Sequence, residues 1–196
     1  MARNRPIGLC GADKRRLDYL EPRHRRAAPI AGNRDIEALF LGALDVPRRQ
    51  RIAKQLKRRG VNLVSCGSWL DKALWGEDRT HLINRAEAFF NIQRYPGEIS
   101  AHRVILGMAN KSLVISEPIY RPAPFIPGKH FVEADVGEMP EALNYYRTHS
   151  EERNNIVDRA HRFVTEELRM DASVSQILAL IAEIRTPGRD ANRCVT

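Results

Sequence analysis

The stretch from Arg94 to Glu117 constrains the fold more than any other, because it joins two apolar strand candidates through a turn and a short helix. The strands are predicted at 88–93 and 112–116, with a Pro-Gly turn and about three helical turns between them. A strand–helix–strand unit of this length is typical of a crossover between parallel strands. The stretch therefore predicts a parallel α/β sheet.

The turn before the crossover helix is a candidate anion site. Pro96 and Gly97 lie at the predicted helix start, and Glu98 lies just inside it. Free backbone N–H groups and the positive dipole end of a helix favour a phosphate. A purely structural crossover is the alternative, since no Gly-rich phosphate fingerprint is present. What favours a ligand site is the group of polar residues around the unit: Glu98, His102, Arg103, Ser116 and Glu117.

The rest of the chain extends the strand–helix pattern. A first strand at 35–41 ends at Gly42, a helix runs from an Asp45 N-cap to Arg59, and a second strand follows at 61–66. A long Pro-rich loop at 118–128 lies beside predicted strand ends, which suggests ligand contact. Further expected elements are a short helix at 80–86, a strand at 130–135, and helices at 138–148, 150–170 and 173–184 that pack back on the sheet.

Length and charge predict one main domain with a basic arm. The 196 residues suit a single core, which we place at 35–186, with an arm or linker at 1–34 and a loose tail at 187–196. The arm carries a net charge of +6 out of +8 for the whole chain. Apart from Tyr19, its basic clusters lack interleaved aromatic residues, so a solvated arm is favoured over nucleic-acid binding.

Several classes of protein lack their sequence signatures here. There is no GxGxxG, P-loop or GxSxG motif, which argues against a dehydrogenase, P-loop NTPase or α/β-hydrolase. Three widely spaced cysteines and six scattered histidines fit neither a disulfide framework nor a metal site, so no metal is expected. No signal peptide or membrane span is recognised. We expect a cytoplasmic protein in a reducing compartment.

A series of short motifs resembles the C-terminal domain of GT-B glycosyltransferases of the spore-maturation (CgeB-like) type. The likeness covers about residues 35–168 and depends on the order and spacing of the motifs. They are the run 35–42, Arg48-Arg49, the run 85–92, the run 95–98, His102-Arg103, the run 114–117, the run 130–132 and the helix start at 150–153.

The resemblance implies a Rossmann-like domain that binds a nucleotide-diphosphate sugar and takes part in sugar transfer to an acceptor hydroxyl. Glu98 falls where retaining enzymes of this fold have the first acid of a Glu-(seven residues)-Glu motif, and the second would fall at Leu106. The expected donor contacts are Gly42, Gly97, Glu98, His102, Arg103, Ser116 and Glu117, while catalytic residues are not assigned.

Each expected contact has a role in this hypothesis. The helix start at Gly97 receives the diphosphate, Arg103 adds charge to it, and Glu98 contacts sugar or ribose hydroxyls. Ser116 and Glu117 shape the nucleoside side, and Gly42 lets the sugar approach. A complete GT-B enzyme needs two such domains, so an acceptor-binding half would be missing, truncated or a separate subunit. A non-catalytic nucleotide-binding or assembly module is the alternative, because fold does not fix function.

Overall fold

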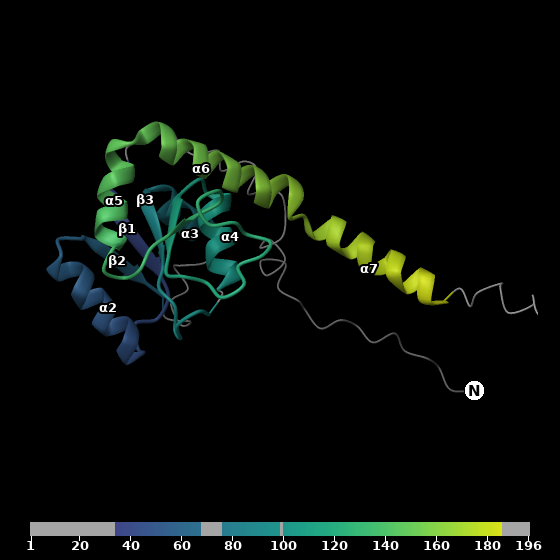
Figure 1. The fold of residues 1–196 in the computed structure, drawn as a ribbon, viewed down its shortest axis with the longest axis horizontal. Helices are drawn as coiled ribbons and strands as arrows, with labels where there is room; N and C mark the ends of the chain where they lie inside the picture. The colour runs from purple at the N-terminus through teal and green to yellow at the C-terminus, as the bar shows by residue number, and fades with distance from the viewer. Residues whose placement is uncertain (1–33, 68–75, 99, 186–196) are drawn as a thin grey trace, which may run out of the picture.

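The computed structural model describes residues 34–67, 76–98 and 100–185, which contain a five-stranded parallel sheet (Figure 1). The predicted arm and tail fall almost entirely outside these residues. The strand order is β2-β1-β3-β4-β5, and every neighbouring pair runs parallel. This confirms the predicted Rossmann-like α/β class. The strands are β1 Ile36–Leu41, β2 Leu63–Cys66, β3 Ala86–Asn91, β4 Leu113–Ser116 and β5 Val132–Glu133.

Helices connect and follow the strands. The helices are α2 Pro47–Arg58, α3 Glu77–Asn84, α4 Ala101–Ala109, α5 Met139–Thr148, α6 Ser150–Arg162 with its π-helical continuation η3 Phe163–Glu167, and α7 Met170–Arg185. None of the helices in the described ranges is long and apolar enough to span a membrane.

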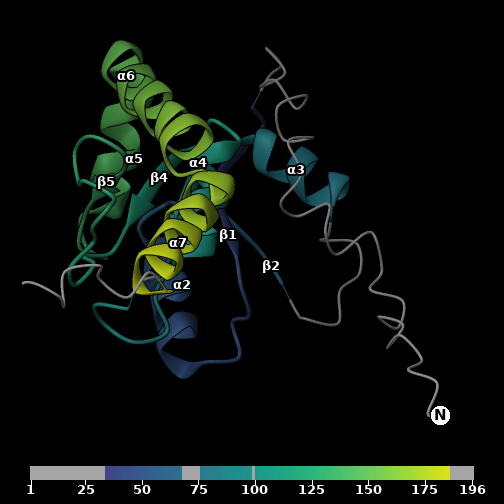
Figure 2. The ribbon, with the colours of Figure 1, turned by 90° about the vertical axis from the view of Figure 1, so that its right-hand side faces the viewer.

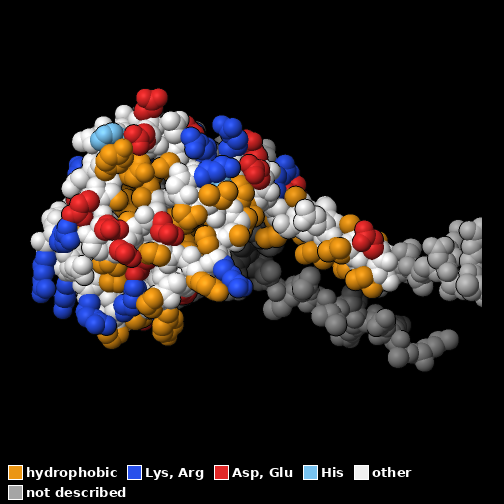
Figure 3. All heavy atoms as spheres, in the orientation of Figure 1, with side chains coloured by type: hydrophobic (Ala, Val, Ile, Leu, Met, Phe, Trp, Pro, Cys, Tyr) orange, Lys and Arg blue, Asp and Glu red, His pale blue; other side chains and the backbone are white. Residues whose placement is uncertain are grey.

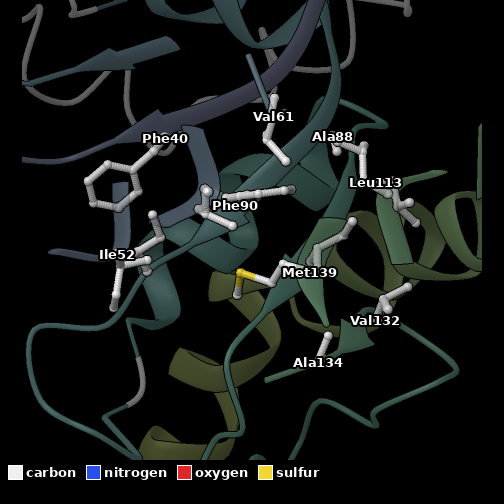
Figure 4. Packing of buried hydrophobic residues seen from close by; sticks show 14 of the residues in the cluster. Phe40, Ile52, Val61, Ala88, Phe90, Leu113, Val132, Ala134 and Met139 are labelled. Carbon is white, nitrogen blue, oxygen red and sulfur yellow. The ribbon is translucent and has the colours of Figure 1, made fainter. Parts of the chain in front are cut away.

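One face of the sheet packs against α2 and α5. Alternate strand residues, such as Phe40, Phe90 and Ile115, point to this side, as the period of a strand requires. They meet Leu56 of α2 and Leu143 of α5 in one buried cluster. Figure 4 shows several of its members turned toward one another.

The opposite face packs against α3 and α4. Here Leu39, Phe89 and Val114 meet Ile83 of α3 and Met108 of α4. Helix α6 contributes to both clusters, since Ile156 belongs to the first and Ala160 to the second. Because both faces are covered, the strands read as nearly continuous apolar runs.

The strand order reverses at β1, which pairs with β2 on one side and with β3 on the other. Ala38 stands opposite Leu63 of β2 and opposite Ala88 of β3. The chain runs from β1 to β2 on one side and from β3 to β4 on the other, so the connections that leave β1 and β3 diverge from the gap between their carboxyl ends. In open α/β sheets this switch point is where ligands bind.

Several predicted boundaries are wrong by a few residues. Helix α2 begins at Pro47 after Val46, and no side chain caps it, so Asp45 is not its N-cap. Helix α3 begins at Glu77 rather than at 80, and β3 begins at Ala86 rather than at 88. Pairing of Ala86 with Ile36 of β1 extends the strand, a tertiary effect that local propensity does not contain.

The C-terminal helical section packs back on the sheet only in part. Helices α5 and α6 do so, whereas α7 leaves the body of the domain (Figures 1 and 2). The helix predicted at 150–170 ends in η3, and Leu168, with φ −88° and ψ 55°, is not helical. The chain redirects there, and the described residues of α7 from Met170 to Ile184 are all exposed.

Candidate functional site

Two buried arginines lie over the switch point. Arg49 of α2 and Arg103 of α4 are only 4% and 6% exposed. Arg103 Nε donates to the Leu41 carbonyl at the end of β1 (2.9 Å), and its Nη1 donates to Asn91 Oδ1 at the end of β3 (2.8 Å). Arg49 Nε donates to the Ile92 carbonyl, which follows β3 (3.2 Å). Both side chains are therefore held at the carboxyl ends of β1 and β3.

The buried ring of Phe40 supports both guanidinium groups. The Cζ atoms of Arg49 and Arg103 lie 5.3 Å and 5.1 Å from its centroid. Within about 6 Å of an aromatic face, a cation is attracted by the ring quadrupole. The ring thus helps to hold two positive charges close together.

No described carboxylate forms a salt bridge with either arginine of the pair, although the Glu98 carboxylate acts on both charges through space. The groups that accept hydrogen bonds from Arg49 and Arg103 are carbonyl oxygens and one amide oxygen. Burial, with Arg49 as the next cause, lowers the pKa of Arg103 to about 10, so Arg103 keeps its charge at neutral pH. Two desolvated cations without a carboxylate partner favour binding of an anion.

Gly42 leaves the space that this arrangement needs. A Cβ at Gly42 would lie 2.7 Å from Cζ of Phe40 and 3.3 Å from Nη2 of Arg103. Its backbone N–H donates to the Cys66 carbonyl (2.8 Å), which ties the end of β1 to the end of β2. The structure thus brings two predicted site residues, Gly42 and Arg103, side by side.

The predicted helix start at Gly97 is wrong, because α4 begins at Ala101. Gly97 has φ +80°, and its N–H donates to Gln93 Oε1 (2.7 Å), so it is not a free helix N-terminus. Its carbonyl accepts from the N–H of Tyr120 (3.1 Å) in the Pro-rich loop. Gly97 therefore closes a turn and joins it to the loop after β4.

Glu98 closes the same turn. One of its carboxylate oxygens accepts from the backbone N–H groups of Arg94 (3.0 Å) and Tyr95 (3.2 Å). Glu98 lies outside α4, so it shares no helix face with His102. The His102 side chain is exposed in the first turn of α4. Desolvation by the protein atoms around it, followed by the charge of Arg103, lowers its pKa.

Ser116 and Glu117 join the ends of β3 and β4. Ser116 Oγ accepts from Asn91 Nδ2 (2.9 Å), so Asn91 links this serine to Arg103. The buried Glu117 carboxylate accepts from the Gln93 N–H (2.7 Å) and forms a two-pronged ion pair with Arg48. The salt bridge of Glu117 is thus with Arg48 and not with Arg49, on which Glu117 acts only through space.

Sequence reasoning missed Arg49 and Asn91 as site residues. Arg49 did carry a signal, because it lies at helical spacing from Ile52 and Leu56 and so on the buried face of α2. A charged residue on an apolar helix face is unusual and points to a function. Asn91 is the last residue of an apolar strand. Because a polar residue at that position can have many causes, the sequence alone did not indicate that Asn91 belongs to the site.

No metal centre is seen in the described part of the chain: it contains no group of three His, Cys, Asp or Glu side chains that could hold an ion.

The sheet order and the site define a Rossmann-like α/β protein with two buried arginines at its switch point. Residues 48–179, more than half of the chain, match the family model described as glycosyl transferase-like. The chain therefore belongs to the glycosyl transferase-like family. None of the curated proteins compared with it matches.

Solved GT-B glycosyltransferases have a similar fold. The Anabaena protein Alr3699/HepE in complex with UDP-glucose is 12% identical, with a TM-score of 0.53 over 74% of this chain and 40% of that one. TarM is 13% identical, with a TM-score of 0.57 over 76% of this chain and 36% of that one. HepE in complex with UDP and glucose gives a TM-score of 0.56 at 12% identity, over 85% and 52%. This chain thus spans about half or less of each of these three structures.

Proposed function

We propose that the chain is the donor-binding half of a glycosyltransferase, of the spore-maturation (CgeB-like) type that its motifs resemble. The donor is a nucleoside-diphosphate sugar, with its diphosphate against Arg49 and Arg103. The observation that carries this proposal is the pair of buried, unneutralised guanidinium groups at the β1/β3 switch point. The binding of UDP-glucose by HepE supports the same class of donor.

The pair suits the leaving group of glycosyl transfer. The bond between the anomeric carbon and the diphosphate oxygen breaks, the acceptor hydroxyl oxygen bonds to that carbon, and the hydroxyl proton passes to a base. Negative charge therefore grows on the diphosphate. Preorganised donors in a partly desolvated site stabilise such charge more than water does. Because Arg49 and Arg103 supply this charge, we expect the reaction to need no metal.

The remaining predicted contacts surround this centre. Gly42 leaves space beside Arg103 for the sugar phosphate, and His102 directly precedes Arg103 in the first turn of α4. Gly97 and Glu98 shape the turn that borders the site through backbone contacts. Ser116 and Glu117 fix the strand ends where the nucleoside would lie.

The acceptor and the base that activates it come from another part of the machinery in this proposal. The chain spans 36–52% of the similar structures named above, so an acceptor-binding half would be supplied by a separate subunit or by further sequence. We place this assembly in the cytoplasm, in line with the three widely spaced cysteines.

A non-catalytic nucleotide-binding module is the second candidate. The observation that favours it is Leu106, which occupies the place of the second acid in the Glu-(seven residues)-Glu motif. Its side chain packs against the buried cluster between α4 and the sheet. In this case donor binding persists without transfer, even when an acceptor-binding half is supplied.

A thermal-shift comparison tests donor binding. We expect UDP, GDP or ADP to stabilise the full chain, by about 2.7 kcal/mol at a concentration of 100 times its Kd. The matching nucleosides, which lack the diphosphate, should stabilise it far less. Equal effects of nucleoside and nucleotide, or no effect of any diphosphate, would show that the arginine pair is not a diphosphate site.

A further inference from the structure

Strand β2 lies at the edge of the sheet. Among the described residues it pairs only with β1, and the strand order ends with it. The Cys66 carbonyl accepts from the Gly42 N–H on the β1 side (2.8 Å). Because successive residues of a strand turn their backbone N–H and C=O groups to opposite sides, those of Ser65 and the Leu63 carbonyl point away from β1. An edge of this kind is a template for a further strand.

A groove of about 440 Å³ lies between this edge and α2. Val61 and Leu63 supply apolar lining, and both pack in the buried cluster on the α2 side of the sheet. On the helix side the lining residues are Ala53, Lys54 and Lys57, which lie three or four residues apart and so share one helix face. Extended peptides bind by strand addition in grooves that combine an open edge with a wall of side chains.

The helix wall of this groove is basic. Helix α2 contains no Asp or Glu, and its Lys54 and Lys57 are exposed and take part in none of the salt bridges of the described residues. Figure 3 shows Lys and Arg side chains gathered where α2 lies in Figure 1. The Glu37 carboxylate accepts from the Asn62 N–H in the groove (2.9 Å), but its salt bridge is with Arg147. The groove therefore suits an acidic ligand.

Charge argues against two other occupants of the groove. The arm at 1–34 has a net charge of +6 and would be repelled by the two lysines. Antiparallel pairing of two copies at this edge would place their basic α2 helices side by side, and such a juxtaposition of like charges is costly. A segment of opposite charge from another protein meets neither obstacle.

We propose that an extended acidic segment of a partner protein adds to the outer edge of β2, with alternate Asp or Glu side chains against Lys54 and Lys57. Main-chain hydrogen bonds to Ser65 and to the Leu63 carbonyl give affinity, and the lysines select carboxylates. Side chains on one face of such a strand recur about every 6.6 Å. The two lysines lie about 4.5 Å apart along the helix axis, and their long side chains bridge the difference.

Fluorescence anisotropy of the full chain with a synthetic peptide tests the proposal. The probe is a capped, labelled peptide of alternating Thr and Glu. Its charge-matched control carries N-methyl groups on the inner backbone nitrogens, which removes the N–H donors. We expect saturable binding of the first peptide and binding of the control that is weaker by about tenfold or more, because main-chain hydrogen bonds are lost. Failure of the first peptide to bind would overturn the proposal. Equal binding of both would also overturn it, since a merely basic surface, of the kind that anionic lipid or nucleic acid contacts, needs no N–H donors.

Charge-reversal variants locate the peptide on the chain. Lys54→Glu/Lys57→Glu should weaken peptide binding by about tenfold or more, since two charge-assisted contacts are lost. The matched control Arg51→Glu/Arg58→Glu reverses two exposed charges of α2 outside the groove and should weaken it by about threefold or less. Equal losses in the two variants would contradict the groove.

A proline at the edge tests the backbone pairing itself. Proline is tolerated on an edge strand whose N–H faces outward, so Ser65→Pro removes a donor from the edge without breaking the pairing with β1. We expect it to weaken peptide binding, with folding checked by far-UV circular dichroism and urea unfolding. Wild-type affinity in the folded variant would contradict strand addition at β2, and the lysine variants decide the case if Ser65→Pro does not fold.

Discussion

Arg49 and Arg103 are costly residues to bury, and their contacts explain how the fold keeps them. Carbonyl oxygens at the ends of β1 and β3 accept their N–H groups, and the Phe40 ring lies against both. These acceptors replace water but do not neutralise the charge. A folded domain that retains two such cations at its switch point is therefore preorganised for an anion.

Gly42→Ala should damage the site as well as the fold. The new Cβ would lie 2.7 Å from Cζ of the buried Phe40 ring, so the ring and Arg103 must shift. We expect a loss of about 1–3 kcal/mol in the free energy of unfolding, the usual cost of overpacking, and weaker nucleoside-diphosphate binding. Urea unfolding and calorimetric titration measure the two effects. Wild-type affinity in the folded variant would show that Gly42 does not shape the site.

His130 should make the domain sensitive to acid. Its ring stacks on Phe163 (4.3 Å between centroids), and its Nδ1 accepts from the Ile126 N–H (3.2 Å), so the buried form is neutral. Burial, with Lys129 as the next cause, lowers the pKa of His130 below its ordinary 6.5. As the pH falls below 6.5, His130 takes up a proton in the unfolded chain before it does so in the folded chain. The free energy of unfolding therefore decreases as the pH is lowered toward the pKa of His130 in the folded state.

Urea unfolding between pH 7.5 and 5 would measure this effect, with His130→Gln compared with the exposed control His81→Gln. We expect a smaller loss of stability in His130→Gln and a wild-type loss in the control. Parallel pH profiles for all three proteins would contradict the assignment.

At the residue level the sequence could predict some of the site and not the rest. Gly42 was identifiable because it ends the first predicted strand, and Arg103 because it lies on the predicted crossover helix. Arg49 was identifiable only from its helical spacing with Ile52 and Leu56. That Glu117 is neutralised by Arg48 could not be predicted, because it depends on how α2 lies against the end of β4.

Among the elements, α4 shows what a local pattern can and cannot contain. Its existence and its place between β3 and β4 were predicted correctly from apolar periodicity. Its start was not, since Gly97 is held by Tyr120 and Gln93 in a turn with a positive φ. A Pro-Gly sequence suits a helix start and a tight turn alike, and a contact distant in sequence decides between them.

Gly107→Ala tests how closely α4 lies on the sheet. A Cβ at Gly107 would lie 2.6 Å from Cγ2 of Val114 and 2.9 Å from Cδ1 of Phe89. Overpacking should cost about 1–3 kcal/mol, more than the gain in helix propensity of up to about 1 kcal/mol. Urea unfolding should show a net loss, while Gly137→Ala, whose Cβ would have only Arg59 Nη1 at 4.0 Å, should be nearly neutral. A stabilised Gly107→Ala variant would mean that α4 lies farther from the sheet.

At the scale of the whole molecule, the parallel direction of the strands was predictable, because short loops between strands and helices permit few topologies. The projection of α7 was not, since its apolar periodicity looks the same whether it packs on its own domain or on another. Sequence periodicity specifies that a face is buried and leaves open which surface buries it.

The isolated chain should bind a nucleoside diphosphate yet transfer little or no sugar. It holds the proposed leaving-group site, whereas the proposal assigns the acceptor and its base to another half. Product analysis with UDP-glucose and with simple sugar acceptors, beside a calorimetric titration with UDP, measures both properties. Robust transfer by the purified chain would refute the division into two halves.

The most direct test of the donor site compares two arginines of the same helix. Arg49 is buried at the switch point, and Arg51, two residues on, is exposed. Calorimetric titration with UDP should show that Arg49→Gln weakens binding by about tenfold or more, because the variant loses one or two charge-assisted hydrogen bonds to the diphosphate. Arg51→Gln should bind UDP as the wild type does. Equal affinities of both folded variants would contradict the placement of the diphosphate at the arginine pair.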